Sequence, residues 1–372
     1  MNKKETLELK RRFKKDSTTI DKIAGCYIDC NKNKVCKIQG KFLSLDEDEY
    51  YKYLEIAKKS LSGTIGNNLL QLEFPLVEEE DNGKQKLLME LMKSKFEDED
   101  LLDKFYDLII ETYDSPGNYL VTLFHDNYDV PMKTKDNMKL DDSEEVYEYI
   151  ICSICPVSLS KPALGYREAE KTIGPRIRDW VVAAPETAIL FPAFTDRSTD
   201  IHNCMFYTKN VKEPHSELME EGLGCKQVRT SNEKREIFKR IIKNNLGNDD
   251  KDAENMYLAM QCGLTEVCEE FEENHADNEE PAAVDENVIR DICKGLEIDD
   301  KKIKQIADDC NEQFNGELDI FTANDTKLVE KADEKLQIME LQEINQVLKE
   351  ENADLRAQVQ ELQRKIIGEN IL

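Results

Sequence analysis

The chain has 372 residues and a formal net charge of −27, because 78 Asp and Glu residues outnumber 51 Lys and Arg residues. A chain this acidic repels phosphate backbones overall, which argues against nucleic-acid binding outside a local basic patch. No apolar run approaches the roughly 18 residues of a membrane span, and the first residues lack the apolar core of a signal peptide. The eleven cysteines are therefore expected as reduced thiols in a cytoplasmic protein without a membrane attachment.

Residues 1–213 predict an α+β domain. The sequence predicts a short helix at residues 3–15. This segment is basic, since residues 1–22 carry eight basic and four acidic side chains. Periodicity then predicts strands at 25–29 and 35–38, a helix from Asp46 to about Leu61, a strand at 69–74, and helices at 84–95 and 98–113. Segments rich in β-branched and aromatic residues follow at 119–124, 146–157, 180–183, 188–194 and 201–207. Because the helices precede these strands rather than alternate with them, we predict a mixed or antiparallel β-rich core with flanking helices.

Residues 214–330 predict an acidic helical module. Helical periodicity marks the segments 231–247, 251–274, 285–295 and 299–314. Residues 249–334 contain 27 acidic and 8 basic side chains, so most of the net negative charge of the chain lies here. A charged fraction this high is typical of long, exposed helices.

The last segment, residues 335–368, has the clearest pattern in the sequence. Leucines recur every seven residues, at Leu341, Leu348, Leu355 and Leu362. If these occupy heptad position d, position a includes Asn345, Asn352 and Val359. Leucine at d with isolated asparagine at a favours a parallel two-stranded coiled coil, so we predict a homodimer through this leucine zipper. The alternative is one amphipathic helix packed on its own domain, whose apolar stripe is usually wider.

Two short motifs in the β-rich region have residue types that occur in functional sites. Cys152 and Cys155 have the CxxC spacing of zinc and redox sites. On a strand, however, residues three apart point to opposite faces, so we predict structural thiols and no metal. His125 and Asp126 end a predicted strand, where such a pair is either catalytic or a hydrogen-bonded loop feature. The second interpretation is favoured, because a lone His beside an Asp is more often such a feature.

The densest polar constellation in this region contains the candidate ligand-binding residues Arg176, Arg178, Asp196, Arg197 and His202. They lie near predicted strand ends, beside the single tryptophan, Trp180. Guanidinium groups offer fixed donors that fit carboxylate or phosphate. The constellation is either a site for an anionic ligand or a structural ion-pair network, and the sequence leaves both open.

Four segments together resemble a known family: YIICSICPV at 149–157, DWVV at 179–182, LFPAFTDRS at 190–198 and YTKN at 207–210. They are similar to the family described as domain of unknown function 4317, whose members occur in clostridia and related bacteria. The resemblance covers roughly residues 1–320 and implies no activity, substrate or catalytic residue. It also implies that the zipper is a departure from the family, since we expect a short β-rich end there.

No phosphate-binding loop, dinucleotide fingerprint, nucleophile elbow or zinc-protease motif is present in the sequence. This favours a homodimeric protein-binding or scaffold protein over an enzyme, with no cofactor and with a cytosolic protein as partner. The alternative is an enzyme or anionic-ligand-binding protein that uses the cluster from Arg176 to His202. A deep pocket lined by those residues would favour the alternative, and a flat, patch-rich surface would favour protein binding.

Overall fold

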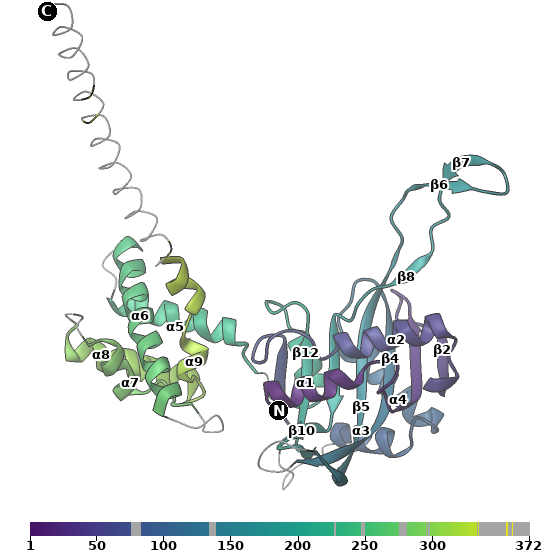
Figure 1. The fold of residues 1–372 in the computed structure, drawn as a ribbon, viewed down its shortest axis with the longest axis horizontal. Helices are drawn as coiled ribbons and strands as arrows, with labels where there is room; N and C mark the ends of the chain where they lie inside the picture. Colours follow the sequence, from purple (N-terminus) through teal and green to yellow (C-terminus); the bar gives the residue numbers. More distant parts are fainter. Residues whose placement is uncertain are drawn as a thin grey trace, which may run out of the picture. The chain divides into compact units, whose positions relative to one another are not determined.

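The computed structural model describes residues 1–75, 83–133, 139–226, 228–246, 250–274, 281–294, 296, 298–332, 334, 355 and 359. The chain divides into two compact units, residues 1–232 and 233–372. The first unit combines helices with an antiparallel sheet, and the described part of the second is helical apart from one isolated β-bridge (Figure 1). The predicted α+β class is therefore confirmed.

The first unit is built around an eight-stranded sheet in the described part of the chain. Its helical elements are α1 (Lys3–Arg12), the 3-10 turn η1 (Phe42–Ser44), α2 (Glu47–Lys59), α3 (Gly83–Lys93), α4 (Glu99–Thr112) and the π turn η2 (Leu218–Gly222). The sheet strands are β1 (Ile20–Ile28), β2 (Lys34–Lys41), β3 (Leu69–Glu73), β4 (Asn118–Lys133), β5 (Lys139–Leu159), β8 (Trp180–Val182), β9 (Thr187–Phe191) and β12 (Asn203–Thr208). They follow the order β2-β1-β4-β5-β9-β12-β3, with β8 paired to β5, and every described pair is antiparallel.

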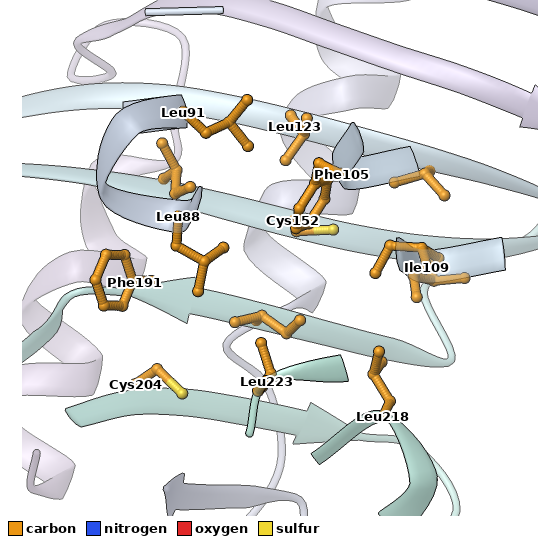
Figure 2. Close-up of a cluster of buried hydrophobic side chains, with 14 of the residues drawn as sticks. Leu88, Leu91, Phe105, Ile109, Leu123, Cys152, Phe191, Cys204, Leu218 and Leu223 are labelled. Atoms are coloured by element: carbon orange, nitrogen blue, oxygen red, sulfur yellow. The ribbon is translucent and has the colours of Figure 1, made fainter. Parts of the chain in front are cut away.

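Both faces of the sheet are covered by helices, because alternate strand residues point to opposite sides. On one face Leu123 packs into a core with α3, α4 and η2, as Figure 2 shows for Leu88, Phe105 and Leu218. On the other face the next residue, Phe124, packs with apolar side chains of α1 and α2. A sheet buried on both faces explains why its central strands are so rich in apolar residues.

Helix α1 has local reasons to begin and end where it does. Asn2 accepts a hydrogen bond from the amide of Glu5, whose carboxylate accepts one from the amide of Asn2. This capping box satisfies free amides at the helix start, and the basic residues of the last turn offset the helix dipole. Leu9 and Phe13 are buried and fix the helix on the sheet.

Two small hairpins project from the main sheet. They are formed by β6 (Leu164–Arg167) with β7 (Thr172–Pro175), and by β10 (Ala193–Thr195) with β11 (Ser198–Asp200). At the turn of the second hairpin, Asp196 and Arg197 both have a positive φ, 51° and 58°. Two adjacent residues with positive φ are typical of the type I′ turn, which matches the twist of a two-residue hairpin.

The second unit packs its helices around its own apolar core. They are α5 (Ser231–Leu246, beginning at the end of the first unit), α6 (Asp250–Asn274), α7 (Glu286–Ile292), α8 (Asp300–Phe314) and α9 (Ile320–Ala323). Phe238, Tyr257 and Ile306 are buried at its centre. Gly263 allows α6 to approach α7 closely, since a Cβ there would lie 2.5 Å from the carbonyl oxygen of Ile292.

The division between the units differs from the predicted boundary at 213/214. Leu218, Met219 and Leu223 belong to the core beneath the sheet, so the first unit continues to Asn232.

In the described part of the chain, none of the helices has the length and apolar character needed to cross a membrane. The zipper positions Leu341, Asn345, Leu348, Asn352 and Leu362 lie outside the described residues. Leu355 and Val359 are described; both are helical, with 57% and 52% of their surface exposed.

Candidate functional site

The five residues of the predicted cluster do not form one site. Arg176 and Arg178 lie beside β8, which pairs with the end of β5 at Leu159. Asp196, Arg197 and His202 lie beyond β9, which pairs with β5 at Ile150 and runs in the opposite direction. At about 3.3 Å per residue, the stretch of β5 between these two pairing points alone spans about 30 Å. The structure therefore separates the cluster into two groups, one at the Leu159 end of β5 and one beside the middle of that strand.

The group around Arg197 joins the second hairpin to α1. The Arg197 guanidinium lies 3.3 Å from the Glu8 carboxylate, and the Arg197 amide donates to Glu5 at 3.3 Å. Asp200 accepts hydrogen bonds from the amide of His202 and the side chain of Asn203. These contacts are those of an ion-pair network that holds a hairpin on a helix.

The other group belongs to an exposed arm, which we define as residues 160–180. Figure 1 shows its hairpin, β6 and β7, extending away from the sheet. Its root is closed by a hydrogen bond of 2.8 Å from the Ser160 amide to the Asp179 carbonyl oxygen. The Arg178 guanidinium adds a second bond, 2.6 Å, to the carbonyl oxygen of Ser160. Arg178 therefore stabilises the root of the arm through Ser160 and does not line a pocket with Arg197.

The arm presents large apolar side chains to solvent. The exposed fractions are 75% for Leu164, 66% for Tyr166, 70% for Ile173, 77% for Ile177 and 58% for Trp180. No residue from 161 to 184 is buried, so the hairpin has no core of its own. An isolated two-stranded hairpin is marginally stable in water, and clustered exposed apolar side chains usually mark an interaction surface.

A pocket of about 850 Å³ lies at the root of this arm, which we call the lysine pocket. Four lysines from two helices line it: Lys10 of α1 with Lys52, Lys58 and Lys59 of α2. Its other walls include Glu55, Ile56, Ser62 and residues 181–185, which are β8 and the turn that follows. The pocket therefore combines apolar walls with a set of cationic groups.

The charges of the lysine pocket are only partly neutralised. Lys52 pairs with Glu55 at 3.2 Å. Among the described residues, Lys10, Lys58 and Lys59 have no acidic partner. Burial lowers the pKa of Lys10, and the charges of Lys58 and Lys59 lower that pKa further. In the described part of the chain, three lysines without an ion-pair partner thus line one cavity, together with Lys52 and Glu55.

His125 and Asp126 are not a catalytic pair, because neighbouring residues of β4 point to opposite faces of the sheet. His125 is fully buried, and its two ring nitrogens contact Asp21 at 2.5 Å and Glu148 at 3.0 Å. Asp126 lies on the other face and accepts hydrogen bonds from Thr19 and Tyr149. The prediction of hydrogen-bonded residues is confirmed, although they lie in the middle of a strand and not in a loop.

The CxxC cysteines lie on β5 and face opposite sides of the sheet, as predicted. Cys152 packs into the core of α3 and α4, and Cys155 into a small cluster with Leu120 and Val157. Burial raises the pKa of Cys155 to about 12 and raises that of Cys152 further. Thiols with such pKa values are inert at neutral pH. In the described part of the chain, no three His, Cys, Asp or Glu side chains are grouped so as to hold a metal ion.

Sequence reasoning missed the lysine pocket, because its walls come from segments far apart in the chain. The signal available was local: Lys58 and Lys59 close one predicted helix and Lys10 lies near the end of another. Basic residues at helix ends are common, since they offset the helix dipole. Only the packing of α1 beside α2 and β8 brings them to one cavity.

Comparison with protein families shows to which family the chain belongs. The model of the family described as Domain of unknown function (DUF4317) matches residues 1–367. The chain belongs to the DUF4317 family. The match extends through the segment of the predicted zipper, so the expectation that this segment departs from the family is wrong. No curated protein matches the chain.

Proposed function

We propose that this DUF4317 protein is a protein-binding protein that captures its partner with the arm. The observation that carries the proposal is the set of large apolar side chains exposed on residues 164–180. Aromatic residues and arginine are enriched where protein interfaces concentrate their binding energy. The arm supplies both, since it contains Tyr166 and Trp180 as well as Arg176 and Arg178.

The charge of the arm favours a partner surface that is apolar with an acidic rim. Residues 160–180 carry five basic and three acidic side chains, against the strong negative charge of the whole chain. Opposite charges at the rim of an interface raise the association rate and suppress wrong partners. An RNA partner would use the same arginines, but the charge of the whole chain opposes it.

Dimerisation through residues 335–368 is the second part of the proposal. A parallel coiled coil would join two chains and thus two arms, while the acidic helical module would keep the assembly soluble. Two linked arms bind a multivalent partner more tightly than one, because the second contact is intramolecular. Light scattering should give twice the 43.0 kDa chain mass, and a chain lacking residues 335–372 should be a folded monomer.

Site-specific photocrosslinking tests the arm directly. A benzophenone amino acid at Ile173 of the tagged full-length protein should capture a defined partner in native cells. The matched control is the same group at Leu43, which is equally exposed (72%) but lies outside the arm. Nuclease treatment before purification identifies an RNA-bridged capture. Equal capture from both positions, or none from Ile173, would refute the arm as the docking element.

A further inference from the structure

We infer that the lysine pocket binds a small amphipathic anion, whose apolar body lies on the pocket walls and whose carboxylate, sulfate or phosphate group meets Lys10, Lys58 and Lys59. This goes beyond the proposed capture of a protein by the arm. It does not depend on that function, since the pocket is formed by α1, α2 and the segment 181–185.

Charge is the first argument. Acidic residues are half again as common as basic ones in this chain. Some lysines of the chain pair with carboxylates, as Lys52 does with Glu55 and Lys15 with Glu47. In the described part of the molecule, the remaining three lysines of the pocket have no ion-pair partner, and the one carboxylate residue in the lining, Glu55, pairs with Lys52. A bound anion would supply the missing negative charge.

The helix dipole gives a competing explanation for these lysines. Lys58 and Lys59 lie in the last turn of α2 and Lys10 in the last turn of α1, where cations are favourable. That effect acts on each helix separately. It does not explain why the ends of two helices turn their cations to the same cavity, where the charges repel and lower the pKa of Lys10.

The apolar walls are the second argument, and they define the ligand further. Ile56, Val181, Val182 and Pro185 are among the apolar residues that line the pocket. The two valines expose 48% and 41% of their surface, although their strand lies on the sheet. A fully hydrated inorganic ion would gain nothing from these walls. The volume of about 850 Å³ lies within the range of about 300–1,000 Å³ that is typical of sites for organic ligands.

Anilinonaphthalene sulfonate is a suitable probe, because it is an amphipathic anion whose fluorescence rises in an apolar site. The full-length protein should bind it with one dominant site. Replacing Lys10, Lys58 and Lys59 together by Gln should weaken binding about tenfold or more, equivalent to about 1.4 kcal/mol or more. Replacing the same three residues by Arg keeps the charge and should keep most of the affinity.

The matched control removes the same net charge elsewhere in the first unit. Lys14, Lys41 and Lys93 are exposed and lie outside the pocket, so their replacement by Gln should change the affinity by less than about twofold. Circular dichroism should show that all variants remain folded. If the control weakens binding as much as the pocket variant does, or if the pocket variant binds as the wild type does, the pocket is not the site.

Competition separates the two features of the ligand. Decanoate should displace the probe, whereas decanol and inorganic phosphate should not do so at the same concentration. Displacement by decanol as effective as that by decanoate would show that charge is irrelevant. Displacement by phosphate as effective as that by decanoate would show that the apolar body is irrelevant. Either result would overturn the inference of an amphipathic anion.

Discussion

Replacing Asp126 by Ala should be among the most destabilising single changes in the first unit. The carboxylate is 1% exposed and lies between α1 and the sheet. It accepts hydrogen bonds from the hydroxyls of Thr19 and Tyr149, and the guanidinium of Arg12 lies 3.8 Å away. The change would leave the fully buried Tyr149 hydroxyl without its acceptor and Arg12 without its counter-charge.

The size of the effect follows from burial. Removing one member of a buried, hydrogen-bonded charge pair costs about 3–5 kcal/mol, because the partners stay desolvated. For a unit of this size, 1 kcal/mol shifts the melting temperature by about 2–4 °C, so a decrease of about 6–20 °C is expected. Asp126→Asn should have a smaller effect, since the amide retains one acceptor oxygen for the hydroxyls.

Calorimetry of the full-length variants measures the shift, and hydrogen exchange locates it. Exchange should accelerate in α1 and β4 while peptides of α6, in the other unit, stay as protected as in the wild type. Asp129→Ala is the matched control, because Asp129 lies on the same strand with an exposed side chain, and its change should stay within about 0.5 kcal/mol. A loss from Asp126→Ala no larger than that of the control would refute the network as a source of stability.

Two further predictions separate structural groups from exposed ones. Arg197→Ala should destabilise the first unit by roughly 1–2 kcal/mol through the partly buried Glu8 pair, whereas Arg178→Ala should stay within about 0.5 kcal/mol, as urea unfolding would show. Iodoacetamide at pH 8 should modify the exposed Cys30 and Cys36 first. Cys155 should react only after unfolding, because burial raises its pKa to about 12 and keeps the thiol protonated. Mass spectrometry that detects early modification of Cys155 would contradict this prediction.

Local periodicity was enough to predict most elements of the fold. Helix α4 (Glu99–Thr112) was predicted at 98–113, and α8 (Asp300–Phe314) at 299–314. The main error in the sheet was at β4, predicted to end at Phe124 but continuing to Lys133. His125 and Asp126 gave the sequence a polar interruption typical of a loop. Their partners come from other elements, so the sequence could not show that both are satisfied inside a strand.

The candidate sites were harder to predict, because proximity in the chain is a poor guide to proximity in a sheet. Arg178 and Arg197 are close in sequence, but β9 lies between them and separates them along β5, one near Leu159 and the other beyond Ile150. Conversely, Lys10 and Lys58 are far apart in sequence and line one pocket. No periodicity encodes either relation; both depend on which strands pair and which helix covers which face.

The contrast between satisfied and unsatisfied groups is the strongest reason to place function at β8. The buried polar groups of the first unit at His125 and Asp126 each have at least two partners, as a stable core requires. Around β8, by contrast, Trp180 and the arm expose apolar surface, and the lysine pocket gathers charge without a carboxylate to match most of it. Both features are unfavourable in the isolated chain, and both would be relieved by binding. Because the chain satisfies polar groups elsewhere and leaves these two features side by side, we propose recognition at that strand.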